Sequence, residues 1–219
     1  NTKSLFDEFK IKYNILTVLT SEPSKSPKEV YKNIKMLDIK YTQFILCLSE
    51  LYNDTEYSIK PKDFAYFYKE VFTLWKKDFL NGLYYSIQFF DNIIPLFDEF
   101  FTPMTCGING KCYNQMVIES NGDVFPCDFY CLDKYNIGNI VYDDFKYIYD
   151  NKIVKDFIHE YKQEEMSDLC GSCKYFIFCN GGCKRMKKNM YIDNDFCWYK
   201  DFLDFSINDI LKILQIISR

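Results

Sequence analysis

The chain has 219 residues, of which 48% are apolar, enough to bury the core of one large domain or two modest ones. Its net charge of −4 argues against a nucleic-acid-binding protein, which normally presents a basic face. The sequence shows no secretion signal and no apolar stretch long enough to span a bilayer. We therefore expect a cytoplasmic protein with neither nucleic acid nor membrane as a partner.

The first hundred residues predict alternating strands and helices. Tyr13–Thr20 and Tyr41–Leu48 are apolar and β-branched, as in buried parallel strands. Helices are expected over Ser21–Asp38 and from near Pro61 to Gly82, with Ser, Pro and Gly as boundary signals. This order implies βα units with right-handed crossovers. Because two strands do not form a stable sheet, we expect missing partner strands in a longer protein.

The pattern changes near residue 101, which suggests two domains, 1–100 and 101–219. Gln115–Phe125 predicts a β-hairpin with a two-residue turn at Asn121-Gly122. In that register Cys127 faces Met116. Cys112 precedes Met116 by four residues, so at roughly 3.3 Å per residue it would lie about 13 Å from Met116 along the strand. The ladder must therefore break near Pro126 or ahead of Gln115 if the two cysteines share a site. Two later segments are expected to be helical, Val154–Asp168 and Phe202–Arg219.

Ten cysteines are the main chemical feature, and nine of them lie from Cys106 onward. An even number could form a disulfide framework in a secreted protein. Without a secretion signal, metal binding is the better interpretation. The cysteines are Cys47, Cys106, Cys112, Cys127, Cys131, Cys170, Cys173, Cys179, Cys183 and Cys197.

The cysteine spacing favours a multinuclear soft-metal centre. It is C-x5-C-x14-C from Cys106, then C-x2-C-x5-C-x3-C from Cys170, then a last cysteine at Cys197. Zinc ribbons usually use two C-x2-C pairs, and only one is present. Iron–sulfur clusters accept less regular spacing, and glycines beside the cysteines, such as Gly181 and Gly182, allow close backbone approach. Eight cysteines could fill two such clusters.

Several other residues have ordinary structural interpretations. We interpret the basic run Lys184–Lys188 as a solvated helix face, and His159 as a solvated helix residue. Cys47 fits the core of a strand. Cys131 fits the core too, or lies near Cys112 across the hairpin. An aspartate such as Asp128 commonly accepts backbone hydrogen bonds in a turn.

Taken together, C-x5-C, "NGDVFPCDFY", "IGNI", and C-x2-C-x5-C-x3-C with "CNGGC" resemble the SPASM domain of radical S-adenosylmethionine (SAM) enzymes. Within that group the chain looks most like the anaerobic sulfatase-maturating enzymes. The resemblance implies an α/β fold. It comprises the last βα units of a partial (β/α)6 radical-SAM barrel, followed by a small, loop-rich iron–sulfur domain with a β-hairpin and a terminal helix.

The resemblance also implies the metal ligands. Two auxiliary 4Fe–4S clusters would be held by eight cysteines, with Cys183 crossing back to the first cluster, as in the split ligation of ferredoxins. The first set is Cys106, Cys112, Cys127 and Cys183. The second set is Cys170, Cys173, Cys179 and Cys197.

The family reaction gives two further residues a role. As the resemblance implies, a 5′-deoxyadenosyl radical removes a hydrogen atom from Cβ of a Ser or Cys of a sulfatase, which becomes Cα-formylglycine. Asp128 matches the proposed general base, which takes the proton of the substrate's thiol or hydroxyl, and a cluster takes one electron. A carboxylate beside a cluster ligand would bring the proton acceptor and the electron acceptor close together. Leu48 matches a position against S-adenosylmethionine, although an ordinary core leucine would look the same.

The chain departs from the family in one respect. It has no C-x3-C-x2-C motif for the third 4Fe–4S cluster, which binds S-adenosylmethionine and receives an electron from a reducing donor. We expect this chain alone to be inactive, as part of a longer enzyme or as a decayed remnant. The alternatives are another SPASM peptide-modifying radical enzyme, or a non-catalytic metal-stabilised peptide-binding module.

Overall fold

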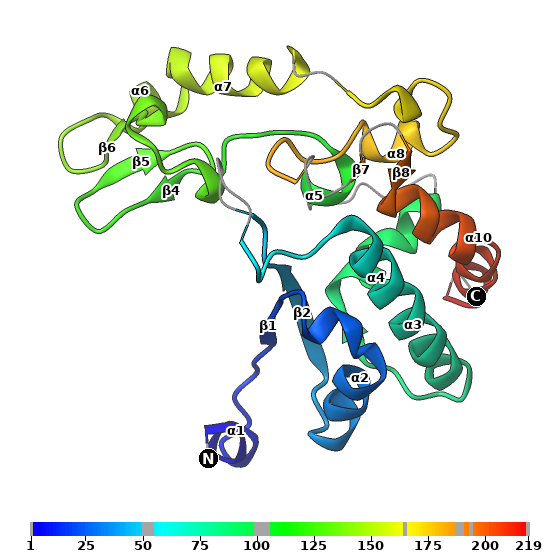
Figure 1. Ribbon diagram of the computed structural model, residues 1–219. Helices are drawn as coiled ribbons and strands as arrows, with labels where there is room; N and C mark the ends of the chain where they lie inside the picture. The colour runs from blue at the N-terminus through cyan, green and yellow to red at the C-terminus, as the bar shows by residue number, and fades with distance from the viewer. Residues whose placement is uncertain are drawn as a thin grey trace. The chain divides into compact units, whose positions relative to one another are not determined.

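The computed structural model describes residues 2–49, 55–98, 106–163, 166–186, 191–192 and 195–217. They form two compact units (Figure 1). Unit 1 comprises Asn1–Met104 and Lys188–Arg219, and unit 2 comprises Thr105–Lys187. The terminal segment thus clusters with the first half of the chain. The domain division 1–100 and 101–219 stays a prediction.

Unit 1 contains a three-stranded parallel sheet in the order β1-β2-β3, of which Figure 1 labels β1 and β2. The strands are β1 (Ile15–Leu19), β2 (Tyr41–Leu46) and β3 (Ser86–Ile87). Ile15 pairs with Thr42, and Tyr41 pairs with Ser86. The two predicted strands and their parallel pairing are confirmed. The third strand has only two residues, too few for an apolar period to reveal it.

Of the two helices predicted in the first hundred residues, α3 (Pro61–Leu80) begins at the expected Pro61, whereas α2 (Pro27–Met36) begins later than the expected Ser21. Proline stands in the first turn of α2 and α3, where its missing N–H costs nothing. α3 is followed by Gly82, whose φ is +79°. The shorter helical segments are α1 (Thr2–Glu8), η1 (Pro23–Lys25), α4 (Gln88–Ile93) and η2 (Pro95–Phe97).

The sheet is buried on one face only. Thr42 and Phe44 of β2 are buried, as is Leu19 at the end of β1. Leu16 and Val18, on the other face of β1, are 57% and 55% exposed. Among the described residues, the expectation of buried strands is therefore met on one face of the sheet and wrong on the other. Apolar composition alone does not reveal which face of a strand has a covering layer.

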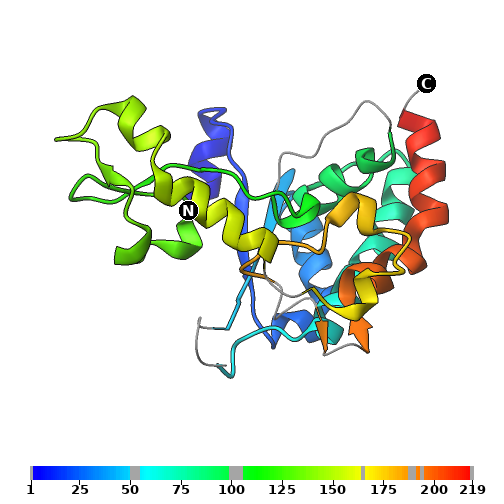
Figure 2. The same ribbon diagram turned by 90° about the horizontal axis from the view of Figure 1, so that it is seen from above.

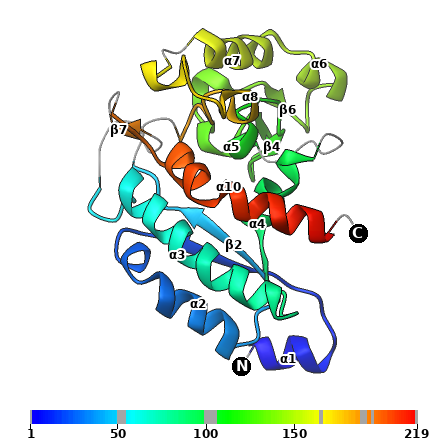
Figure 3. The same ribbon diagram turned by 90° about the vertical axis from the view of Figure 1, so that its right-hand side faces the viewer.

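An aromatic core joins α3, α4 and the terminal helix α10 (Trp198–Ile217). Figures 2 and 3 show α10 beside α3. Phe202 is fully buried, with ring centroids 5.2 Å from Phe89 and 5.7 Å from Phe72. At the helix surface, Lys69 and Lys76 pair with carboxylates of α10 at 2.6 Å. α10 begins before the predicted Phe202, directly after the short pair β7 (Tyr191–Ile192) and β8 (Phe196–Cys197).

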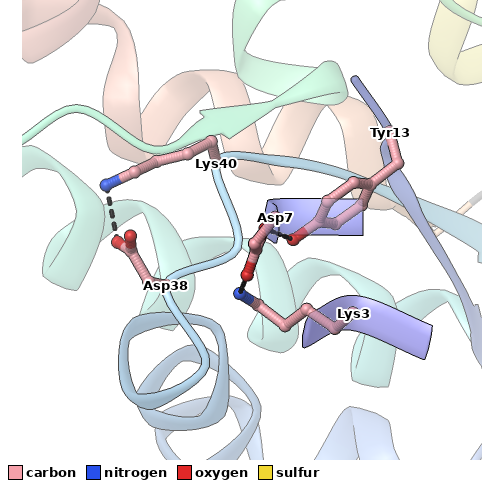
Figure 4. A network of polar contacts seen from close by, with 5 residues as sticks. All are labelled: Lys3, Asp7, Tyr13, Asp38 and Lys40. Atoms are coloured by element: carbon pink, nitrogen blue, oxygen red, sulfur yellow. Dashed lines mark hydrogen bonds and ion pairs between the residues drawn. The ribbon is translucent and has the colours of Figure 1, made fainter. Parts of the chain in front are cut away.

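Polar contacts hold α1 to the start of β1 (Figure 4). Asp7 accepts hydrogen bonds from Lys3 at 2.5 Å and from Tyr13 at 2.8 Å. These bonds lower the pKa of Asp7, and the same contact raises the pKa of Lys3. Lys40 donates to Asp38 at 2.5 Å in the turn before β2. All these groups are at the surface, so the contacts orient the chain and contribute little stability.

Unit 2 is built on the hairpin of β4 (Val117–Ile118) and β5 (Asp123–Phe125), extended by β6 (Gly138–Asn139). Val117 pairs with Phe125, so the predicted register is wrong by one residue. The connection has three residues and ends at Gly122 with φ +90°, the left-handed position of such a loop. Met116, with φ +53°, ends the ladder on the other side.

The rest of unit 2 consists of short helical segments around a small apolar core, formed by Val124, Ile137, Ile148 and Val154. α7 (Lys152–Gln163) confirms most of the predicted helix, while residues 164 and 165 lie outside the described part. The cysteine-rich stretch is loop-like with short turns, as expected. The other segments are α5 (Cys106–Asn109), η3 (Asp128–Tyr130), η4 (Asp133–Tyr135), α6 (Phe145–Tyr149), η5 (Asp168–Cys170) and α8 (Phe176–Cys179).

Within the described ranges, none of the helices combines the length and apolar character needed to cross a bilayer.

Candidate metal centre

A cavity in unit 2 brings together three of the predicted ligands. The thiols of Cys112, Cys127 and Cys183 come from segments far apart in the sequence, and all three residues line it. Lys111 and Lys184 stand directly beside two of them. The full lining is Gly110, Lys111, Cys112, Tyr113, Gln115, Cys127, Tyr130, Phe157, Cys183 and Lys184. The structure therefore confirms that the ladder breaks before Cys112, since an unbroken hairpin would separate it from Cys127.

The hairpin positions Cys127 and the chain leading from Cys112. Cys127 follows Pro126 at the end of β5 and is 8% exposed. The backbone N–H of Gln115 donates to the carbonyl of Pro126 at 2.9 Å, so contact continues one step past the regular ladder. The left-handed turn at Met116 then redirects the chain. The regular strand pairing therefore ends between Cys112 and β4.

A tight left-handed loop positions Cys183. Asn180, Gly181 and Gly182 all have positive φ, of 46°, 82° and 82°. The N–H of Gly182 donates to the carbonyl of Cys179 at 2.7 Å, and Asn180 Nδ2 donates to the carbonyl of Asn109 at 2.9 Å. The second bond ties this loop to α5, which begins at Cys106. The side chain of Cys106 lies outside the described part of the chain.

Three of the four cysteines in the second predicted set lie close together in the sequence. Cys170 ends η5 and Cys179 ends α8, with Cys173 between them. The N–H of Cys173 donates to the carbonyl of Cys170 at 3.3 Å, which places the first two on one turn. Cys197 ends β8 in unit 1. The grouping of these four residues into one site stays a prediction.

The donor set of the cavity fits an iron–sulfur cluster. Thiolates are the ligands that such clusters use, one on each iron, so the sulfurs surround the metal core at some distance from one another. Among the described side chains, no three of His, Cys, Asp and Glu converge closely enough to bind one metal ion. Three cysteines spread around a shared cavity match the wider arrangement, and nearby lysines suit an anionic cluster.

Burial makes Cys127 costly to ionise in the protein alone. Burial is the main cause that raises the pKa of Cys127 to about 12, and the charge of Asp128 and the thiol of Cys183 raise it further. Metal binding requires the thiolate, so binding here would release a proton and would itself stabilise the charged sulfur.

Asp128 lies beside Cys127, a predicted ligand, but does not line the cavity. It begins η3, its side chain is exposed, and its Oδ1 accepts a hydrogen bond from the thiol of Cys127 at 3.5 Å. Cys131 is half-buried, with its Sγ 3.7 Å from the carbonyls of Cys127 and Asp128. The core position expected for Cys131 is therefore wrong. The structure places the Asp128 carboxylate at the surface, next to a predicted ligand.

Lys184 is far more buried than the basic run around it suggests. Its side chain is 5% exposed, residues 184–186 form a turn, and Arg185 stacks near Phe129. The expectation of a solvated helix face is thus wrong for this part of the run. Its position directly after Cys183 does not signal burial, because Cys183 is only half-buried and Lys174, which follows Cys173 in the same way, is exposed. Lys187 and Lys188 lie outside the described residues.

Three remaining residues stand elsewhere. Leu48 is half-buried and lies just beyond the carboxyl end of β2, the end at which parallel α/β sheets bind ligands. Cys47, next to it, is half-buried too, not part of a fully buried core. His159 is exposed on α7, as expected.

Residues 106–174 match SPASM, an iron–sulfur cluster-binding domain. The chain is 38% identical over 217 residues to the cysteine-type anaerobic sulfatase-maturating enzyme of Clostridium perfringens, covering 95% of this chain and 58% of the relative. The enzyme of the same description from Clostridium novyi (strain NT) is 35% identical over 222 residues, covering 98% and 59%.

The fold also matches a solved structure, native anSMEcpe with bound AdoMet and Kp18Cys peptide. The TM-score is 0.87 at 35% identity, covering 97% of this chain and 60% of that one. The chain thus spans less than two thirds of the length of these relatives. In sequence and in fold, the chain is thus similar to the anaerobic sulfatase-maturating enzymes and matches their carboxyl-terminal portion.

Proposed function

We propose that this chain is the carboxyl-terminal part of a radical SAM enzyme that oxidises a cysteine or serine of a sulfatase to Cα-formylglycine. The observation that carries this proposal is the cavity lined by Cys112, Cys127 and Cys183, in a chain related to sulfatase maturases along nearly its whole length. Because the two relatives named above are cysteine-type enzymes, a cysteine is the favoured target.

Eight cysteines would hold two auxiliary 4Fe–4S clusters in this proposal. One set is Cys106, Cys112, Cys127 and Cys183, and the other is Cys170, Cys173, Cys179 and Cys197. When bound, the clusters and S-adenosylmethionine would supply an acceptor for one electron and the abstraction of a hydrogen atom. The glycine-containing loop from Asn180 lets the backbone turn tightly between ligands of the two sets.

Asp128 would receive the proton of the substrate thiol or hydroxyl on its carboxylate. Its exposure makes the carboxylate accessible to a bound peptide, and its position directly after Cys127 in the chain keeps it beside the metal site. Leu48, at the carboxyl end of β2, would give apolar contact to S-adenosylmethionine. The proton acceptor, the carboxylate of Asp128, would then be next to Cys127, which would bind the cluster that accepts the electron.

The partners follow from this chemistry. A sulfatase polypeptide is the substrate, and a reducing donor supplies electrons. Because thiolate ligands persist in a reducing compartment, the cytoplasm is the proposed location. The chain has no C-x3-C-x2-C motif, so formation of the radical would need a segment beyond these 219 residues, and the chain alone would be inactive.

The test is turnover by the anaerobically purified full-length protein, with S-adenosylmethionine, a reductant and a synthetic sulfatase peptide. Mass spectrometry should detect formylglycine from a cysteine peptide and none from an alanine peptide. Loss of two hydrogens alone would indicate a thioether or carbon–carbon link, and thus another SPASM peptide modifier. A protein with no turnover but peptide binding would indicate a binding module.

Asp128→Asn tests the base, with Asp133→Asn as the matched control on the next exposed turn. Removing a general base typically lowers the rate by about 10²–10⁴-fold. We expect that loss in Asp128→Asn alone, with the iron content of both variants unchanged. Full turnover by Asp128→Asn would overturn the assignment.

A further inference from the structure

The buried ammonium of Lys184 has no role in the function proposed so far. Its Nζ lies 2.6 Å from Glu160 Oε2. It also lies over three aromatic rings, 4.2 Å from the centroid of Phe157, 4.9 Å from Tyr130 and 5.3 Å from Tyr135. A lysine is rarely this buried unless it is paired, and here a carboxylate and three ring faces surround it.

The surroundings of the ammonium are rigid. The rings of Tyr130, Tyr135 and Phe157 contact one another edge to face, with centroids 5.0 to 5.6 Å apart. Tyr135 also donates a hydrogen bond to Glu160 at 2.8 Å, which fixes the carboxylate. Tyr130, Phe157 and Lys184 all line the cavity of the thiols. The positive charge is therefore held in one place beside the predicted ligands.

The charge is not fully cancelled by its partner. The Glu160 side chain is 50% exposed, whereas the Lys184 side chain is 5% exposed. Water screens the exposed carboxylate more strongly than the buried ammonium, because effective interactions weaken as the local dielectric rises. The cavity thus has a net positive neighbour at Cys183.

We propose that the positive charge of Lys184 raises the reduction potential of the cluster held by Cys106, Cys112, Cys127 and Cys183. The inference rests on the ligation proposed above. A thiolate-bound cluster is anionic and becomes more so when it gains one electron, so a nearby fixed cation stabilises the reduced form. The electron comes from substrate oxidation. The cation would make this cluster the better acceptor.

The test is an anaerobic redox titration of the holoprotein, followed by electron paramagnetic resonance. The signal of this cluster is the one lost in Cys112→Ala. Lys184→Met should lower the equilibrium constant for reduction by about tenfold or more. For one electron, a tenfold change lowers the reduction potential by about 59 mV. Lys184→Arg, which keeps the charge, should leave it unchanged.

Lys174→Met is the matched control. Lys174 also follows a predicted ligand, Cys173, and stacks on a ring, 4.8 Å from Tyr175, but its side chain is exposed. Loss of this solvated charge should leave unchanged the reduction potential of the cluster whose signal is lost in Cys112→Ala. An equal shift in both variants would overturn the assignment to a buried, localised charge.

Glu160→Gln decides the question if Lys184→Met fails to assemble the cluster. It removes the counter-charge and should move the potential upward, opposite to Lys184→Met. An unchanged or lower potential in Glu160→Gln would overturn the inference while leaving the iron content, and with it the proposed function, intact. Absence of iron from the unsubstituted protein would overturn both.

Discussion

Replacing Gly181 with alanine tests how the loop before Cys183 is held. Gly181 has φ +82°, a region that disfavours residues with a Cβ. A Cβ there would lie 2.9 Å from Sδ of Met166, the far end of a flexible and half-exposed side chain, which can move aside. The backbone strain therefore dominates, at about 1–2 kcal/mol.

Hydrogen exchange measures this strain directly. The amides of Asn180 and Gly182 donate to carbonyls at 2.8 Å and 2.7 Å, so their protection reports opening of the loop. A cost of about 1–2 kcal/mol corresponds to roughly 5–30-fold faster exchange. Gly171→Ala is the control, because Gly171 has φ −61° and its nearest atom would be Asp168 O at 3.5 Å. Equal exchange in both variants would refute the reasoning.

Two further predictions concern stability. Phe202→Ala should cost about 3–5 kcal/mol, because the ring is fully buried, whereas the exposed Phe205→Ala should cost less than about 1 kcal/mol; urea unfolding followed by tryptophan fluorescence measures both. Burial pushes the pKa of Glu160 up, but hydrogen bonds from Lys184 and Tyr135 outweigh it and hold the pKa below 4.5. Glu160 therefore stabilises unit 2 above pH 4.5, and this contribution is lost as pH falls through the lower folded pKa. In Glu160→Gln, acid unfolding should lack the loss of stability that comes from protonating this carboxylate. Identical acid transitions in Glu160→Gln and the unsubstituted protein would contradict the prediction.

Local signals in the sequence predicted the long elements well. α3 was expected from near Pro61 to Gly82 and spans Pro61–Leu80, because proline at the first turn and glycine after the last residue act within the helix itself. The parallel strands β1 and β2 follow from their apolar, β-branched composition. These features depend on neighbouring residues in the chain.

Features that depend on distant contacts were not predicted. Asn121-Gly122 suits both a two-residue and a three-residue loop, and the choice depends on pairing beyond the turn, so the register was wrong by one residue. Lys184 is buried by rings and a carboxylate from 24 to 54 residues away along the chain, which no local charge pattern reveals. By contrast, the spacing of the cysteines, together with the family resemblance, identified three residues that line one cavity.

Iron analysis tests the central proposal, two clusters on two sets of cysteines, most directly. The anaerobically purified full-length protein would be compared with Cys112→Ala and Cys170→Ala, one from each set. We expect each variant to lose about four iron atoms per protein, and the double variant about eight, because each set would bind one 4Fe–4S cluster under this proposal. A colourless protein with bound zinc, or variants whose iron losses do not add, would contradict the assignment.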